Sequence, residues 1–245
     1  RDLITRMKEQ NVMICAVTHT ALPTCEDVHW QTHHVMFNSG ATAIPGTRMC
    51  QGVGFLVDKK LASDPEASIQ FYQISGRTAA IRFNKANCRI FIGVHYAPTS
   101  SHHPSAREAA HDELADLLAM PREGEITIIM GDFNASIGNA TAFNDGVCGP
   151  HGNPRLNRAG TQLRGLLAQH ELLSPHTFRP QTTEGTWQHP ATNSSHQIDH
   201  IFITKPWAGL VKKCINAPPL LNSDHLSMRL HMELPHELTV RASGK

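Results

Sequence analysis

The stretch at residues 125–134 constrains the fold more than any other part of this sequence. A run of mostly β-branched apolar residues at positions 126–130 ends at Gly131, which predicts a buried strand. Asp132, Phe133 and Asn134 follow, so an acid and an amide stand at the rim of a sheet with an aromatic ring turned to the core. A carboxylate there can hold a divalent cation or deprotonate a water molecule. The same residue types also suit an Asx turn, so the stretch alone leaves a structural role open.

The length, composition and net charge predict one globular domain without a strong overall electrostatic field. The chain has 245 residues, of which 40% are hydrophobic, enough for one large core. We assign residues 1–235 to the domain and residues 236–245 to a C-terminal tail. Because the net charge is only +1, any recognition of phosphate must be local. The seventeen histidines include no repeated pair at metal spacing, and we expect most of them at the surface.

Cysteine usage predicts an intracellular, reducing compartment. Six cysteines are scattered along the chain without a C-x-x-C spacing, which argues against a zinc site or a disulfide scaffold and favours reduced thiols. No apolar run approaches transmembrane length and no signal peptide is visible, so we expect no membrane insertion by this chain. The sequence opens on Arg1 instead of Met, which is typical of a fragment or a processed product.

The apolar patterns alternate between strand and helix periods, as in an α/β protein with mixed or antiparallel sheets and outer helices. Leu3, Ile4 and Met7 predict an amphipathic helix at residues 1–10, and further helices are expected at 104–120 and 158–173. The segments 23–50 and 135–154 are rich in loop-forming residues and are predicted to be irregular. Strands are predicted at residues 12–17, 52–57, 69–74, 78–83, 88–96, 197–203, 210–216 and 226–232.

The helix at the start of the chain runs directly into a strand. Such a helix is usually the middle of a β-α-β unit, so a first strand is expected before Arg1 and is missing from this sequence.

Three later segments repeat the design of an ionisable group at the end of a strand. Asp199 opens one strand, Asp224 and His225 precede another, and Tyr96 ends a third. Together with Asp132 and Asn134, these groups suit metal-assisted phosphodiester hydrolysis, with hard oxygen ligands for Mg²⁺ and donors for phosphate oxygens. Each of them, taken alone, is more often structural.

The ordered set of motifs resembles the endonuclease/exonuclease/phosphatase superfamily. The resemblance is most specific for the apurinic-type endonuclease domain of long interspersed (non-LTR) retroelements and for its craniofacial-development-protein-like relatives, and it spans residues 12–231. It implies a four-layer α/β sandwich of two mixed, mostly antiparallel sheets flanked by helices. The motifs are Tyr-Ala-Pro-Thr at 96–99, Gly-Asp-Phe-Asn at 131–134, Asn157 with Gly160 and Leu163, Thr-Phe at 177–178, Thr-Trp at 186–187, Gln-Ile-Asp-His at 197–200 and Ser-Asp-His at 223–225.

The resemblance also implies roles for individual residues. Asp132 would activate or orient the attacking water, and Asn134 and Tyr96 would hold the scissile phosphate. His225 would donate to that phosphate, oriented by Asp199. Asp224 would approach the metal ion.

The pattern departs from the family at the first metal ligand. Relatives have a glutamate in a Gln-Glu-Thr signature, where this chain has His19 or, with a shift of one residue, Thr18. Neither supplies an anionic oxygen, and Glu26 and Asp27 lie too far along a loop to substitute.

Two hypotheses therefore stay open. In the first, the chain is a Mg²⁺-dependent endonuclease with a weakened metal site, in which His19 favours Mn²⁺. In the second, it is a pseudo-enzyme that needs no cofactor and serves as a structural or binding subunit with protein partners in a larger assembly.

Nucleic-acid contacts are predicted around the same site. Arg77, Asn157 and Trp187 would bind phosphate or DNA, and the alternative for Trp187 is a place in the core. Arg158 follows Asn157 where relatives often have an acid, and it would join Arg155 and Arg164 on a DNA-facing surface.

Overall fold

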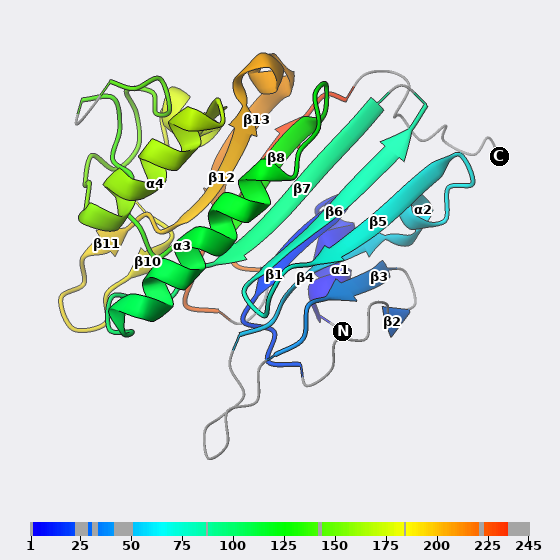
Figure 1. Ribbon diagram of the computed structural model, residues 1–245, viewed down its shortest axis with the longest axis horizontal. Coiled ribbons are helices and arrows are strands. Elements are labelled where there is room, and N and C mark those ends of the chain that lie inside the picture. Colours follow the sequence, from blue (N-terminus) through cyan, green and yellow to red (C-terminus); the bar gives the residue numbers. More distant parts are fainter. Residues whose placement is uncertain are drawn as a thin grey trace.

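A computed structural model of the chain describes residues 2–22, 29–30, 34–41, 51–86, 88–141, 144–183, 185–220 and 223–234. Its largest element is a six-stranded sheet in the order β5-β6-β7-β8-β12-β9, drawn through the middle of Figure 1. β7 and β8 are parallel, and the other neighbours are antiparallel. The strands are β5 (Ala67–Gln73), β6 (Thr78–Lys85), β7 (Cys88–Tyr96), β8 (Ile126–Asp132), β9 (Leu172–Leu173) and β12 (Asp199–Thr204).

A second strand layer packs on one face of this sheet. It consists of a four-stranded sheet in the order β1-β4-β3-β2 and a separate antiparallel pair, β13 with β14. An apolar core that includes Phe55, Ile92 and Ile128 fills the space between the two layers. The strands are β1 (Ile14–Thr18), β2 (His29–Trp30), β3 (His34–Asn38), β4 (Val53–Asp58), β13 (Val211–Ala217) and β14 (Ser227–Met232).

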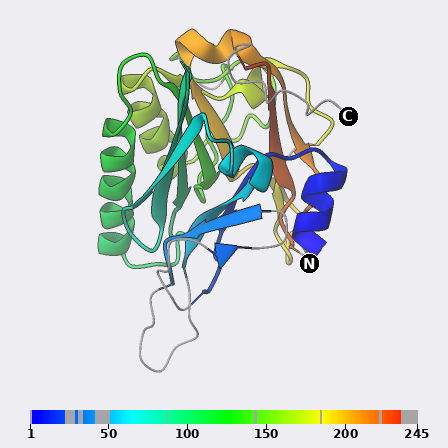
Figure 2. The ribbon, with the colours of Figure 1, turned by 90° about the vertical axis from the view of Figure 1, so that its right-hand side faces the viewer.

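Helices form the two outer layers, as Figure 2 shows from the side. α3 (Pro104–Ala119) and α4 (Arg158–Gln169) cover the outer face of the six-stranded sheet through Leu114, Leu117 and Leu167. α1 (Asp2–Glu9) lies on the opposite side of the molecule, outside the second strand layer. The four-layer sandwich with helices outside is confirmed. The short elements are α2 (Lys59–Ala62), η1 (Pro175–Phe178), η2 (Lys205–Leu210), β10 (Trp187–Gln188) and β11 (Ser195–His196).

Gly131 explains how β8 fits against β7 at the rim of the sheet. Its φ is +146°, a value that L side chains rarely adopt, and a Cβ atom there would lie 1.9 Å from the carbonyl oxygen of His95. Only glycine lets the two strands stay paired at this point. The pairing fixes the position of the next residue, Asp132, opposite Tyr96.

Two predicted loops are more ordered than their composition suggests. The prediction for residues 23–50 misses β3, which pairs with β4 and is buried along most of its length. The segment 135–154 was expected at the surface, yet Ala135, Ile137 and Val147 are buried. The reason is Arg164 of α4, whose guanidinium pairs with Asp145 at 2.7 Å and ties the segment down.

The end of α4 also differs from the prediction. The helix stops at Gln169 instead of continuing to residue 173, because Leu172–Leu173 form β9 at the edge of the sheet.

The four cysteines that the structure describes are free: Cys15, Cys88, Cys148 and Cys214. Among the described residues, no helix combines the length and the apolar character that crossing a bilayer requires.

Candidate active site

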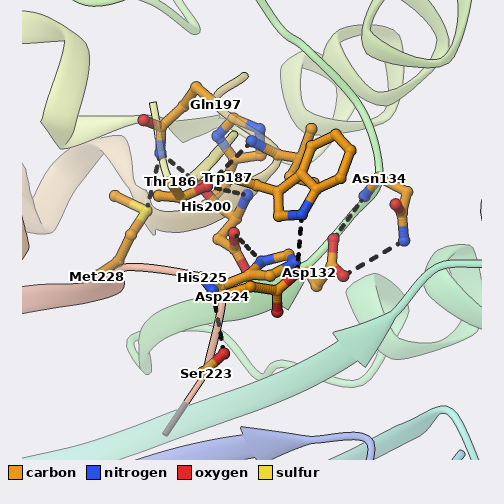
Figure 3. Close-up of polar contacts among 12 residues, drawn as sticks. Asp132, Asn134, Thr186, Trp187, Gln197, His200, Ser223, Asp224, His225 and Met228 are labelled. Carbon is orange, nitrogen blue, oxygen red and sulfur yellow. Dashed lines mark hydrogen bonds and ion pairs between the residues drawn. The ribbon is translucent and has the colours of Figure 1, made fainter. Parts of the chain in front are cut away.

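Asp132 and Asp199 face each other across two neighbouring strands. They are direct partners in the antiparallel register of β8 and β12. His225, just ahead of β14, places its Nδ1 atom 2.9 Å from Oδ2 of Asp199. One candidate ligand atom from each of these three side chains lies within 4.8 Å of the other two. In the described part of the chain, they form the one group of His, Cys, Asp or Glu side chains close enough to share a metal ion. Figure 3 shows Asp132, Asp224 and His225 in this region.

The carboxyl groups of Asp132 and Asp199 lie close enough in this cluster for the charge of Asp199 to affect the ionisation of Asp132. Asp132 is 8% exposed, and its burial, followed by the nearby charge of Asp199, raises the pKa of its carboxyl to about 7. Burial of the His225 ring opposes its protonation, but the hydrogen bond and charge of Asp199 outweigh this and raise the pKa of His225. Ionisation of Asp132 therefore brings two carboxylates that repel one another close together, and a bound cation would relieve that repulsion.

Asn134 holds the Asp132 carboxylate in place. Its backbone N–H donates to Oδ1 at 2.9 Å, and its Nδ2 donates to Oδ2 at 3.3 Å and to the carbonyl oxygen of Ala97 at 2.8 Å. Asn134 adopts a left-handed conformation with φ +46°, which asparagine tolerates better than most residues. The backbone geometry thus fixes both carboxylate oxygens of Asp132.

Thr186 and Gln197 support Asp199 from behind, and sequence reasoning assigned them no role. The Thr186 hydroxyl accepts from the backbone N–H of Asp199 at 3.2 Å, and Gln197 Nε2 donates to the Asp199 carbonyl at 2.7 Å. Both side chains are buried. The sequence did mark both residues, because they belong to the motifs on which the family resemblance rests.

Tyr96, Arg77 and His19 form a stack beside the cluster. The His19 ring lies 5.7 Å from the Tyr96 ring at an angle of 20°, and the Arg77 guanidinium carbon lies 5.2 Å from the Tyr96 centroid. His19 is exposed and does not belong to the metal-capable group. Glu26 and Asp27 lie outside the described residues.

Asp224 is held by Trp187 and lies outside the three-residue cluster. The indole Nε1 donates to Asp224 Oδ2 at 3.0 Å, and the Trp187 ring centroid lies 6.3 Å from that of His225 (Figure 3). Trp187 is half-buried at the rim, so the alternative that placed it in the core is wrong. The structure brings Asp224 close to the site but turns its carboxylate to the indole.

The basic residues predicted to face DNA occupy different environments. Arg164 is 2% exposed and binds Asp145, so the prediction that it lines a DNA surface is wrong. Asn157 caps α4 by accepting from Gly160 N at 2.8 Å. Arg155 and Arg158 are exposed, and Arg155 Nη1 lies 3.0 Å from Nε2 of His196.

Two buried histidines lie behind the rim, although most of the described histidines are half-buried or exposed, as expected. Phe133 packs between the rings of His95 and His200, at 5.8 and 6.0 Å. Burial lowers the pKa of His95 to about 3 and that of His200 to about 4, so both are neutral. His200 Nε2 hydrogen-bonds the Ala135 carbonyl oxygen at 2.8 Å, which makes it a structural support of the loop after Asp132.

Comparisons with known proteins agree with this geometry. A sequence model described as the Endonuclease/Exonuclease/phosphatase family matches residues 23–225. The chain is 26% identical to Craniofacial development protein 2 of Bos taurus over 181 residues, which is 71% of this chain and 29% of that protein. The protein of the same name from Tragulus javanicus is also 26% identical over 181 residues, 30% of its length. The chain thus spans less than a third of these relatives.

Solved structures share the fold at low identity. The endonuclease domain of TRAS1, a telomere-specific non-LTR retrotransposon, has a TM-score of 0.65 at 16% identity, covering 95% of this chain and 91% of that one. The AP endonuclease LMAP of Leishmania major has a TM-score of 0.74 at 12% identity, covering 96% of this chain and 82% of that one. An AP endonuclease from Archaeoglobus fulgidus has a TM-score of 0.65 at 15% identity, covering 94% and 93%.

Proposed function

This chain belongs to the endonuclease/exonuclease/phosphatase family, and we propose that it acts as an endonuclease of the retroelement type that hydrolyses phosphodiester bonds of DNA with a divalent cation. The observation that carries the proposal is the convergence of Asp132, Asp199 and His225 from three separate segments. Such a set serves no packing purpose, because it concentrates charge that burial makes costly.

The donor set fits Mg²⁺ or Mn²⁺. Asp132 and Asp199 would hold the ion through carboxylate oxygens, the ligands that hard cations prefer. When bound, the ion would neutralise phosphate charge and acidify a water molecule. The set offers fewer oxygen ligands than a full octahedral shell needs, so we infer weak binding and a preference for Mn²⁺ over Mg²⁺, because Mg²⁺ demands a near-ideal octahedral shell.

The protein's own groups have distinct tasks in this proposal. Asp132, held by Asn134, orients the attacking water or accepts its proton. His225 uses Nδ1 for its bond to Asp199, so Nε2 is left to donate to a phosphate oxygen. Tyr96 and Arg77 at the rim offer further donors to the phosphate, and Trp187 offers an aromatic face to a base or sugar.

One observation favours a second candidate, a pseudo-nuclease that binds protein partners. The residue in the place of the family glutamate, His19, is exposed and stacks on Tyr96 instead of joining the cluster. A site without that ligand loses much of its affinity for the ion, and the fold could then serve as a binding subunit.

A nicking assay on supercoiled plasmid separates the two candidates. The purified chain should nick the plasmid with Mn²⁺ and more slowly with Mg²⁺, and Asp132→Asn should lower the rate at least about a hundredfold. Asp116→Asn is the matched control, because Asp116 is an exposed acid on α3. Nicking that is absent, or that persists unchanged in Asp132→Asn, rejects the nuclease and favours the pseudo-nuclease.

A further inference from the structure

The connection between β5 and β6 presents Arg77 to the rim of the candidate active site. This segment, the Arg77 turn, comprises residues 74–77, and Ser75 N donates to the Thr78 carbonyl oxygen at 2.9 Å. Tyr96 N donates to the Arg77 carbonyl oxygen at 2.8 Å, and Arg77 Nη1 donates to the Tyr96 carbonyl oxygen at 3.3 Å. The conformation of the Arg77 turn therefore decides where the Arg77 guanidinium lies beside the Tyr96 ring.

Glu113 reaches the Arg77 turn from the helical layer. It lies on α3, which covers the outer face of the six-stranded sheet (Figure 1), and it is half-buried. Its Oε2 atom accepts from Ser75 Oγ at 2.7 Å and from Thr78 Oγ1 at 3.2 Å. Hydrogen bonds to a carboxylate are stronger than those between neutral groups. One carboxylate oxygen thus binds hydroxyl groups on both sides of Arg77.

Helix packing does not explain an acid at this position. Other acids of α3, such as Glu108, are exposed, and the buried contacts of the helix come from apolar side chains. Those residues are Ala110, Leu114, Leu117 and Leu118. Glu113 instead binds two hydroxyl groups that lie 38 and 35 residues away in sequence. Loss of the carboxylate should therefore remove the contact with the Arg77 turn and keep the packing of the helix.

Thr78 fixes the place of that carboxylate on the sheet. A hydroxyl group has one proton. Because Thr78 Oγ1 donates its proton to Glu113, the oxygen accepts from His95 Nδ1, which lies 2.8 Å away. Burial lowers the pKa of His95 to about 3, so the ring is neutral and carries its proton on Nδ1. Thr78 and His95 are 0% and 2% exposed, so the carboxylate is anchored to buried groups.

Ser75 connects this anchor to Arg77. Its hydroxyl proton goes to Glu113, and its oxygen accepts from Arg77 N at 3.0 Å. A hydroxyl that donates to a carboxylate is a better acceptor, because successive hydrogen bonds polarise one another. Gly52 N also donates to the Gly76 carbonyl oxygen at 2.7 Å. Since this second contact remains, loss of Glu113 should displace the Arg77 turn without unfolding it.

We propose that Glu113 is a positioning residue of the active site, which holds the Arg77 guanidinium in the place where it meets a phosphate of bound DNA. Glu113 acts through Ser75 and Arg77 and touches neither substrate nor metal ion. The inference rests on the proposed nuclease function, in which Arg77 supplies a donor to the phosphate. It implies that Glu113 affects the affinity for DNA and leaves the reacting groups, Asp132 and His225, unchanged.

The kinetics of plasmid nicking with Mn²⁺ test this role. Glu113→Ala should raise KM about tenfold and leave kcat within about twofold, because the phosphate contact is made equally in the bound substrate and in the transition state. Ser75→Ala breaks the same link without altering α3 and should raise KM to a similar extent. Glu113→Gln keeps an acceptor oxygen, so its KM should stay within about threefold of the wild-type value. The pH–rate profile should not move in any of these variants.

Two controls separate positioning from a purely structural effect. Glu108→Ala removes an exposed acid from the same helix and should leave KM unchanged. In an Arg77→Ala background, Glu113→Ala should raise KM by less than about twofold further, because the group that it positions is gone. An effect that adds fully to that of Arg77→Ala, an equal effect in Glu108→Ala, or a fall in kcat at unchanged KM overturns the proposal.

Hydrogen exchange at the Arg77 amide distinguishes a failure of this inference from a failure of the nuclease function. Glu113→Ala should speed that exchange by about tenfold, whereas Glu108→Ala should not change it. Unchanged exchange in Glu113→Ala, when the wild-type protein nicks DNA, rejects the role of Glu113 alone. Faster exchange in Glu113→Ala, when the wild-type protein does not nick DNA, rejects the nuclease function and the role in phosphate binding with it.

Discussion

Nδ1 of His225 lies 2.9 Å from Oδ2 of Asp199, and this contact sets the charge and orientation of the imidazole at the candidate site. A carboxylate on Nδ1 favours the protonated ring and leaves Nε2 as the donor toward substrate. Asp224, the neighbour of His225 in sequence, instead accepts a hydrogen bond from Trp187. The two acids therefore should differ in their effect on catalysis.

We predict that Asp199→Asn lowers the nicking rate about a hundredfold, whereas Asp224→Asn changes it by less than about threefold. Loss of the Asp199 charge lowers the pKa of His225, so the alkaline limb of the pH–rate profile should move to lower pH in Asp199→Asn. Rates measured across pH for both variants check this. Equal losses in the two variants, with unshifted profiles, would show that Asp199 does not act through His225.

Cation binding should be coupled to proton release at Asp132. Because the pKa of this carboxyl is raised to about 7, it is largely protonated below that pH and must lose its proton before it can ligate a metal ion. We expect the affinity for Mn²⁺ to fall by up to about tenfold per pH unit below pH 7. Calorimetric titration in buffers of different ionisation enthalpy measures the proton released.

The same raised pKa gives a stability prediction with a defined sign. Between about pH 4 and pH 7 the folded protein keeps a proton on Asp132 that the unfolded chain has lost, so this stabilising contribution disappears as the pH rises through 7. Asp132→Asn should therefore be more heat-stable than the wild type at pH 8 without metal, and should release no proton on adding Mn²⁺. A variant that is less stable at pH 8 contradicts the assigned charge repulsion.

Arg164→Met should be strongly destabilising, by about 3–5 kcal/mol, because it leaves Asp145 without its partner and frees the carbonyl oxygens of Ile137 and Asn139. Arg158→Met, on the exposed first turn of the same helix, should cost less than about 0.5 kcal/mol. Urea unfolding of both variants measures the difference. A similar small effect in both would mean that the buried ion pair does not anchor the 135–154 segment.

Acid should destabilise the protein through its buried histidines. Burial lowers the pKa of His95 to about 3 and the pKa values of His176 and His200 to about 4, against an ordinary value of about 6.5. Below pH 6.5 the unfolded chain takes up protons that the folded protein refuses, so stability falls toward pH 4 at up to about 1.4 kcal/mol per pH unit for each histidine. His200→Gln places an amide donor near the position of Nε2, within reach of the Ala135 carbonyl, but cannot titrate in this range, and it should flatten the pH dependence of the unfolding free energy accordingly. An unchanged slope would contradict this origin.

Runs of apolar and β-branched residues predicted most of the fold. β7 was predicted to the residue, and β4, β5, β6, β12, β13 and β14 within a few residues at each end. β3 was missed because its ends, His34 and Asn38, are polar residues that are nevertheless buried, so the strand has no apolar alternation at its boundaries. The anchoring of the 135–154 segment depends on the Arg164–Asp145 pair, and side chains 19 residues apart leave no periodic signal.

The sequence predicted only part of the geometry of the candidate site. Asp132 and Asp199 each stand at a strand end, and the antiparallel pairing of β8 and β12 brings them together. Asp224 and His225 are consecutive residues with different partners, since His225 contacts Asp199 and Asp224 accepts a hydrogen bond from Trp187. The motif alone did not express this difference.

The direct pairing of Asp132 with Asp199 also makes this site sensitive to errors in assembly. If β12 slipped by one residue against β8, the residue opposite Asp132 would be Ile198 or His200, and every side chain of the strand would change faces. A misaligned chain could keep its helices and much of its sheet and still have no acidic pair. Activity in a preparation of this protein would thus report the fraction of molecules whose strands are correctly aligned, which spectroscopic measures of helix and sheet content do not distinguish.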